Sequence, residues 1–108
     1  MKDFDKIIWR NALTFVDFFA VWCGTCRAMT PVIDRFQKQM NGRADVYRMD
    51  IEDPDLLEIV RRYNIVSVPT LMFFRRGEVL WRESGLASYD HLVNVLRELE
   101  KREQVAQR

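Results

Sequence analysis

Two cysteines separated by two residues are the side chains of this sequence best suited to chemistry. They lie in Trp22-Cys23-Gly24-Thr25-Cys26, and the chain of 108 residues holds no other cysteine. A disulfide between such close neighbours closes a very short loop, so it removes little entropy from the unfolded chain and is a weak structural staple. Small secreted scaffolds use several cysteines at wide spacings instead. We therefore interpret the pair as a reactive dithiol.

Metal binding is the alternative use of a CxxC pair. A tetrahedral zinc site needs four ligands, usually cysteine and histidine. The chain has a single histidine, His91, which lies far along the sequence and is expected on the surface of the last helix. Since one chain does not supply a Cys/His set, redox chemistry is favoured and no metal site is expected.

The elements around the cysteines are expected to activate them. Residues 13–21 are nearly all apolar, which indicates a strand buried on both faces, as in parallel sheets. Residues 27–40 carry apolar side chains at helical spacing. A CxxC pair between a strand and a helix is a recognised redox signal.

Cys23 is expected at or next to the N-terminus of that helix. Unpaired N–H groups and the helix dipole there favour a thiolate, so the pKa of the thiol is lowered. Cys26 lies one turn further on and is placed to attack a mixed disulfide formed by Cys23. Gly24 allows close approach of a partner's backbone, and Trp22 supplies an apolar flank.

The remaining pattern predicts a mixed sheet with helices on both faces. A βαβ unit, which crosses over right-handed, is followed by a ββα unit. Besides the segments above, helices or strands are expected over residues 4–10, 45–51, 54–63, 70–74, 79–83 and from Ser88 to about residue 100. From Lys101 onward the chain is polar, and we expect it to fray.

The bulk composition excludes several functional classes. The length fits one domain, residues 1–108, and 48% apolar with 31% charged residues indicates a globular chain. A net charge of +1 provides no field for nucleic acid or an anionic membrane. No apolar run approaches the roughly 18 residues of a membrane span. The first residues lack the apolar stretch of a secretory signal, so a cytoplasmic location is expected.

The segment Val16-Asp17-Phe18-Phe19-Ala20-Val21-Trp22-Cys23-Gly24-Thr25-Cys26-Arg27 resembles the active-site segment of thioredoxins. Val68-Pro69-Thr70, Gly77 and Gly85 stand at matching places, and the resemblance extends over about residues 4–99. It implies a thioredoxin-like three-layer α/β/α sandwich.

The resemblance also implies a docking surface beside the cysteines. Pro69 matches the family's cis-proline, and the backbone of Val68 would pair with an extended stretch of substrate. An ordinary trans proline is the alternative, since few X–Pro bonds are cis. The implied docking residues are Trp22, Gly24, Val68, Pro69, Gly85 and Leu86.

Asp17 stands in an apolar segment where a carboxylate is costly to bury. Desolvation is expected to raise its pKa. The resemblance implies that Asp17 exchanges a proton with Cys26; the alternative is a strand-end carboxylate that reaches solvent. Arg48 stands where thioredoxins usually have a lysine. It is expected either to lower the pKa of Asp17, without itself exchanging a proton, or to be a solvated strand residue.

Thr25 replaces the proline usual between the two cysteines of thioredoxins. Reduction potentials on related sites range from about −270 mV for thioredoxin to about −120 mV for a strong oxidant. The hydroxyl of Thr25 can stabilise a thiolate, and a rigid proline is lost. We expect the reduction potential of this protein to lie less than halfway along that range from the thioredoxin value, so that the protein is less reducing than thioredoxin.

The N-terminal segment is short for the family. About 11 residues precede the central strand, whereas thioredoxins usually open with a strand and then a helix. We expect a sheet of about four strands that lacks the usual first strand and leaves residues 45–51 at an exposed edge. Asp45, Arg48 and Asp50 are charges that discourage pairing there. A monomer is expected, with edge-to-edge dimerisation as the alternative.

The leading functional hypothesis is a thiol–disulfide oxidoreductase that reduces protein disulfides. No cofactor is bound, the redox-active group is the Cys23–Cys26 disulfide, and electrons come from a separate NADPH-dependent flavoprotein of the thioredoxin reductase type. One alternative is a disulfide isomerase or oxidant, favoured by Thr25 if the protein is exported. Another is a non-catalytic binding module, or a dimer sharing an iron–sulfur cluster. The intact cysteine pair, Asp17 and Pro69 argue against a degenerate module.

Overall fold

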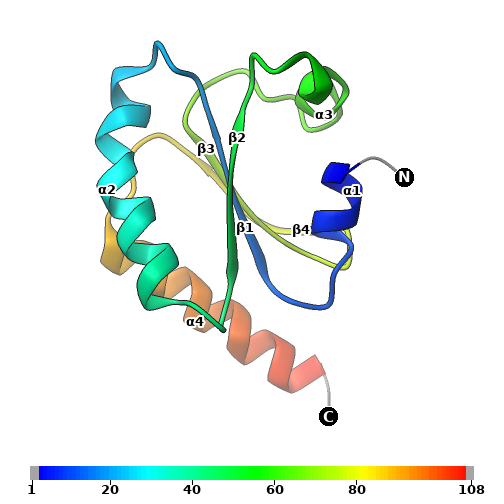
Figure 1. Cartoon of the computed structure of the whole chain (residues 1–108). Helices are drawn as coiled ribbons and strands as arrows, with labels where there is room; N and C mark the ends of the chain where they lie inside the picture. The colour runs from blue at the N-terminus through cyan, green and yellow to red at the C-terminus, as the bar shows by residue number, and fades with distance from the viewer. Residues whose placement is uncertain (1–2, 107–108) are drawn as a thin grey trace.

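A mixed four-stranded sheet lies between two layers of helices (Figure 1). The computed structural model describes residues 3–106. The elements are α1 (Asp3–Ile8), β1 (Thr14–Phe19), α2 (Gly24–Gln39), β2 (Asp45–Asp50), the 3₁₀ turn η1 (Pro54–Leu56), α3 (Leu57–Arg62), β3 (Thr70–Arg75), β4 (Glu78–Ser84) and α4 (Tyr89–Ala106). The expected three-layer α/β fold with four strands is confirmed.

The strand order β2-β1-β3-β4 combines one parallel and two antiparallel pairs. β1 and β2 are parallel and are joined through α2, as the βαβ pattern predicts. β3 runs antiparallel to both β1 and β4. Within residues 3–106, β2 therefore forms one edge of the sheet, where an exposed edge was predicted.

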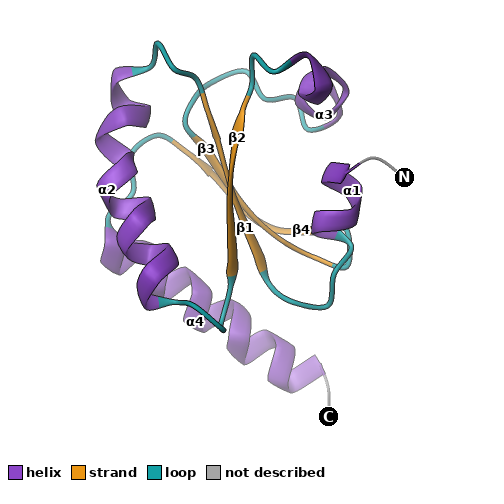
Figure 2. Ribbon diagram, viewed as in Figure 1, coloured by secondary structure: helices purple, strands orange, loops and turns teal. Residues whose placement is uncertain are grey.

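Helices cover both faces of the sheet (Figure 2), and an apolar core lies between the sheet and the helices on each face. Alternate residues of a strand point to opposite faces. Phe15 of β1 packs among residues of α2 and α4, whereas its neighbour Val16 packs with α1 and α3. Burial on both faces explains why β1 is nearly all apolar.

The helix boundaries differ from the expected ones in two places. α2 begins at Gly24, three residues before the expected Arg27, because Cys23 acts as its N-cap. α4 continues to Ala106, beyond the end that the pattern predicts near residue 100. Its last residues include lysine, arginine, glutamate and glutamine, which are strong helix formers, so a polar composition alone does not end a helix. Ser88 caps α4 as predicted: its Oγ accepts the His91 N–H at 3.1 Å.

None of the helices within residues 3–106 combines the length and apolar composition needed to cross a lipid bilayer.

Candidate active site

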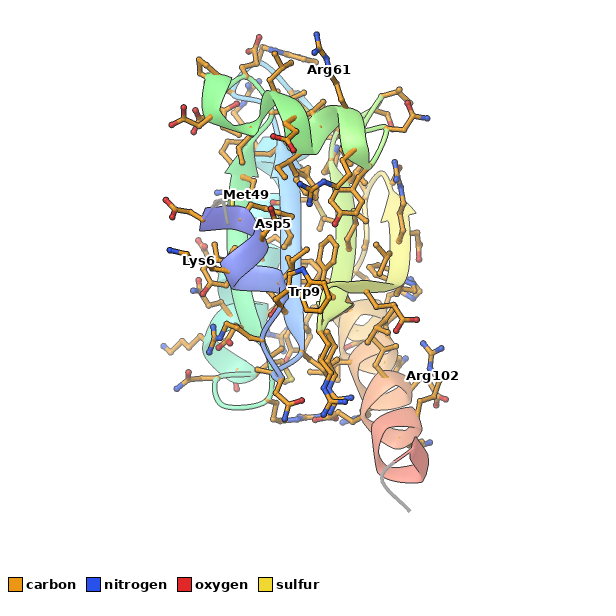
Figure 3. All side chains as sticks on the ribbon, turned by 90° about the vertical axis from the view of Figure 1, so that its right-hand side faces the viewer. Asp5, Lys6, Trp9, Met49, Arg61 and Arg102 are labelled. Atoms are coloured by element: carbon orange, nitrogen blue, oxygen red, sulfur yellow. A yellow bond between two sulfur atoms is a disulfide. The ribbon has the colours of Figure 1, made fainter. Side chains whose placement is uncertain are left out.

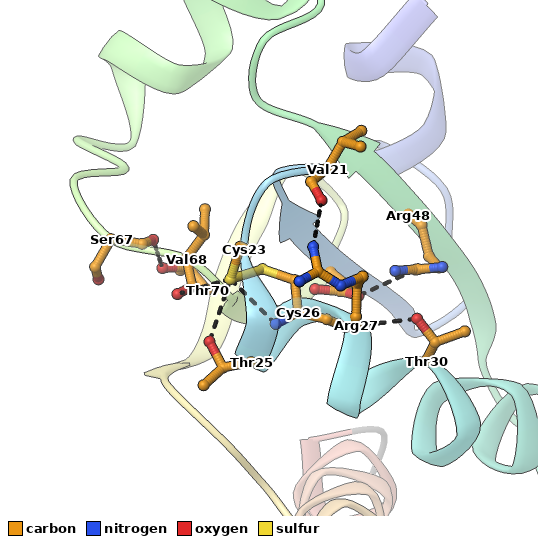
Figure 4. Close-up of a disulfide and its surroundings, with 11 residues drawn as sticks. Val21, Cys23, Thr25, Cys26, Arg27, Thr30, Arg48, Ser67, Val68 and Thr70 are labelled. Atoms are coloured by element: carbon orange, nitrogen blue, oxygen red, sulfur yellow. Dashed lines mark hydrogen bonds and ion pairs between the residues drawn. A yellow bond between two sulfur atoms is a disulfide. The ribbon is translucent and has the colours of Figure 1, made fainter.

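The cysteine pair lies at the N-terminus of α2, directly after β1. The Cys23 N–H donates to the Ala20 carbonyl at 3.2 Å, which closes the turn between strand and helix. Cys23 has extended backbone angles and is the N-cap, and its sulfur accepts the Cys26 N–H, which no helix carbonyl binds in the first turn. Cys23 and Cys26 form a disulfide with Cα atoms 5.2 Å apart (Figure 4). The structure thus places both cysteines where the sequence predicted them.

Two hydrogen-bond donors converge on the sulfur of Cys23. The backbone N–H of Cys26 lies 3.1 Å from Sγ, and the Thr25 hydroxyl oxygen lies 3.2 Å from it. A disulfide sulfur carries no proton, so both groups donate. Hydrogen bonds to an ionised acceptor are stronger than those to a neutral one. Both donors are therefore poised to stabilise a thiolate at Cys23 after reduction.

The Val68–Pro69 peptide is cis, as the resemblance implied. Val68 packs against the buried cluster of Ala20, Cys23 and Cys26, and its carbonyl oxygen lies 3.7 Å from the Cys23 sulfur (Figure 4). The Gly85 N–H donates to the Pro69 carbonyl at 2.9 Å, which holds the loop after β4 next to the Val68–Pro69 peptide. The predicted docking residues Val68, Pro69 and Gly85 therefore lie together beside the cysteines.

Four exposed apolar side chains belong to the loops that hold these residues; we call Val21, Trp22, Val66 and Leu86 the apolar rim. Trp22 and Leu86 were predicted, and they are 64% and 62% exposed. Val21 and Val66 are 68% and 80% exposed and were not assigned to the site from the sequence. In the sequence, only the position of Val66 in a loop, two residues before Val68, could have indicated that it belongs to the site.

Asp17 is fully buried on β1, which excludes a carboxylate that reaches solvent. It alternates with Val16 and Phe18, so it lies on the face of the sheet that α2 covers. Burial raises the pKa of Asp17, and this effect outweighs the charge and hydrogen bond of Arg48, which lower it.

Arg48 stands opposite Asp17 in the β1–β2 register. Its Nε donates to Asp17 Oδ2 at 3.2 Å, and its guanidinium lies 4.6 Å from the centre of the Phe19 ring. The other carboxylate oxygen, Oδ1, has no hydrogen-bond partner among residues 3–106. Arg48 is thus paired with the buried acid rather than merely solvated.

His91 lies on the surface of α4, as expected. Its Nε2 is 2.9 Å from Glu83 Oε2. In the described part of the chain, no three His, Cys, Asp or Glu side chains are grouped as metal ligands would be.

Comparisons with known proteins agree with this geometry. The sequence model of the Thioredoxin family matches residues 1–98. A thioredoxin of Staphylococcus epidermidis is 32% identical over 95 residues, which is 88% of each chain. A thioredoxin of Rickettsia felis is 40% identical over 80 residues, or 73% of each chain. The solution structure of the oxidised thioredoxin from Plasmodium falciparum matches with a TM-score of 0.76 at 28% identity, over 92% of this chain and 91% of that one.

The relatives and the bonded Cys23–Cys26 pair together define the chemistry as thiol–disulfide exchange on protein disulfides. The chain belongs to the thioredoxin family and is a protein-disulfide reductase.

Proposed function

We propose that Cys23 is the attacking cysteine and Cys26 the resolving one. In the reduced protein, the Cys23 thiolate attacks one sulfur of a substrate disulfide, forms a mixed disulfide and releases the first substrate thiolate. The Cys26 thiolate then attacks the Cys23 sulfur and releases the second. The substrate gains two electrons, and the pair is left as a disulfide. The position of Cys23 at the helix N-cap, with two donors on its sulfur, is the observation that carries this assignment.

Asp17 is proposed as the base that takes the proton of Cys26. The buried carboxylate has a raised pKa, which brings it closer to neutral pH and makes it a better proton acceptor than an ordinary aspartate. Arg48 acts as a positioning residue: it binds Oδ2 and leaves Oδ1 for the proton. Because an arginine stays charged, Arg48 holds the carboxylate without competing for the proton.

The substrate is proposed to dock as an extended segment beside Val68. Backbone pairing at Val68 would hold its disulfide near Cys23, since the Val68 carbonyl lies 3.7 Å from the Cys23 sulfur. Pro69 and Gly85 shape this surface, exposed Gly24 leaves room above the disulfide, and the apolar rim contacts apolar side chains next to the substrate cysteines.

Thioredoxins act on protein disulfides, receive electrons from a reductase and carry their redox chemistry in the disulfide itself. We propose that this chain receives electrons from a separate NADPH-dependent flavoprotein reductase, acts as a monomer and works in the cytoplasm.

Insulin reduction with NADPH and a thioredoxin reductase tests these roles. The wild type is expected to turn over, and Cys23→Ser to be inactive. Cys26→Ser is expected to accumulate a mixed disulfide with insulin through Cys23, visible by mass spectrometry. Trapping through Cys26 in Cys23→Ser, with none in Cys26→Ser, would reverse the assignment.

The same dithiol can also serve as an isomerase or oxidant, and Thr25, which contacts the Cys23 sulfur, favours this second role. The reduction potential separates the two roles. A value less than halfway from about −270 mV toward about −120 mV fits a reductase, and a value near the upper end fits an oxidant.

A further inference from the structure

A cavity of about 790 Å³ opens between α1 and α3, on the face of the sheet that α2 does not cover. Figure 3 shows Met49 of β2 between these two helices. The apolar part of the lining comes from Phe4, Ile7, Met49, Leu56, Leu57 and Ile59. Leu57 is half exposed, so the cavity presents apolar surface to solvent.

The cavity adjoins the open edge of the sheet. The Asp45 N–H donates to the carbonyl of Leu13, just before β1, and the Ile51 N–H donates to the carbonyl of Phe19, the last residue of β1. In a parallel ladder alternate residues bond the same neighbour, so residues 45, 47, 49 and 51 face β1 and residues 46, 48 and 50 point their backbone groups away from it. Within residues 3–106 no strand pairs with these outward groups. An added strand would direct every second side chain toward the cavity.

Acidic side chains surround this opening. The lining includes Asp3, Asp53, Asp55 and Glu58 but one basic residue, Arg61. Glu58 is paired with Arg62 at 3.3 Å. The excess of carboxylates favours a basic occupant.

The same charges disfavour a second copy of this chain. If the β2 edges of two copies pair antiparallel about a two-fold axis, both acidic openings lie on the same face of the joined sheet and repel each other. The register centred on Arg48 also sets two arginines opposite each other, which is destabilising.

We propose that the β2 edge and the adjoining α1–α3 cavity bind an extended segment of a partner protein, which adds as a fifth strand, inserts alternate apolar side chains and presents lysine or arginine to the acidic opening. Neither cysteine and none of the proposed substrate-docking residues lines this cavity. Binding here is therefore separate from disulfide exchange at Cys23, and a partner held at the edge leaves the redox site free.

The probe is the peptide Lys-Thr-Val-Ser-Val-Ser-Val-Thr-Lys, whose valines and lysines share one face when extended. Amide–water exchange of the ¹⁵N-labelled protein is measured by NMR with millimolar peptide. We expect the amides of Val46, Arg48 and Asp50 to slow by about tenfold or more on binding, since they gain hydrogen bonds. Tyr47 and Met49, which already bond β1, are expected to stay unchanged. Unaltered exchange at residues 46, 48 and 50 would overturn the proposal.

Charge reversal tests the acidic opening. The same peptide with glutamate at both ends is expected to bind about tenfold more weakly. Asp55→Lys should narrow or reverse this preference. The matched control Asp34→Lys, which makes the same change in net charge on exposed α2, should leave it intact. Equal affinity of wild type for the two peptides, or equal effects of the two variants, would contradict the proposal.

Insulin reduction by Asp55→Lys is expected to equal that of wild type. Partner binding at the β2 edge and disulfide reduction at Cys23 are therefore tested separately.

Discussion

At the scale of single residues, the chemistry depends on a few groups around one sulfur atom. The Thr25 hydroxyl is the side-chain donor at 3.2 Å from Cys23 Sγ. A hydrogen bond to a thiolate is stronger than one to a disulfide sulfur, so this contact stabilises the reduced form over the oxidised form. Thr25 therefore makes the protein less reducing than it would be without the hydroxyl.

Removing that hydroxyl gives a measurable change in potential. Thr25→Val keeps the shape of the side chain and is expected to lower the reduction potential by about 30 mV, which corresponds to about 1.4 kcal/mol. Thr25→Ser keeps the hydroxyl and serves as the control, with a potential close to that of wild type. Glutathione equilibration measures both. A Thr25→Val potential at or above the wild-type value would contradict this role.

Asp17 gives a pH dependence of stability whose sign follows from its raised pKa. In the unfolded chain Asp17 loses its proton near the ordinary value of 3.8, whereas the folded protein retains the proton to higher pH. The folded state thus binds more protons across this window, so the free energy of unfolding falls as pH rises through it. The Asp17 carboxylate therefore opposes folding at neutral pH.

Asp17→Asn removes that fall in stability. The gain in stability of the variant over wild type is expected to be larger at pH 8 than at pH 4. The variant is also expected to resolve the mixed disulfide more slowly, because the base is lost. Urea denaturation at the two pH values checks the first effect, and single-turnover kinetics with insulin checks the second. Parallel stability curves for the two proteins would count against a raised native pKa.

At the scale of elements, the turn between β3 and β4 is held against the N-terminal segment. Gly77 lies in this turn with φ of 79°, and its N–H donates to the Ile8 carbonyl at 2.8 Å. The indole of Trp9 covers Gly77 so closely that a Cβ there would overlap the ring. Gly42 has a similar φ of 87° but open space where its Cβ would be.

These two glycines form a matched pair. Gly42→Ala is expected to cost about 1 kcal/mol of stability through its backbone conformation alone. Gly77→Ala is expected to cost about 1 kcal/mol more, because the indole must move. Adding Trp9→Ala should remove that excess, which a double-mutant cycle by chemical denaturation measures. Equal losses for the two glycine variants would show that Trp9 does not pack on the turn.

The elements that carry the chemistry follow largely from local sequence. The apolar run of β1, the spacing in α2 and the CxxC between them are enough to predict Cys23 at a helix N-terminus. The burial of Asp17 can also be predicted from the sequence, because Asp17 stands in the same apolar run. The Asp17–Arg48 pair was suggested by resemblance, since the strand register that joins the two residues is a tertiary property.

Other features depend on packing that local sequence does not encode. Val21 and Val66 are single valines in loops, and exposure is set by how these loops surround the cysteines. The α1–α3 cavity arises from the relative placement of two short helices on the sheet. α4 extends past the end that the pattern predicts near residue 100, because lysine, glutamate and glutamine favour a helix although they are polar.

At the scale of the whole molecule, the β2 edge determines the expected oligomeric state. Asp45, Arg48 and Asp50 lie on the edge strand, and the acidic opening adjoins it. Charged side chains on an edge strand discourage pairing, and the acidic openings of two copies would repel each other, so we expect a monomer at micromolar concentration. Sedimentation equilibrium checks this, and a stable dimer in that range would contradict it.

The protein as a whole works if one sulfur is held as an anion at the start of α2. The direct measurement is a titration of Cys23 in the reduced protein, followed by thiolate absorbance, with Cys23→Ser to assign the transition. We expect a pKa below the value of about 8.5 for a free thiol, because the helix N-terminus and the donors from Thr25 and Cys26 favour the thiolate. A transition at about 8.5 or above would contradict the account.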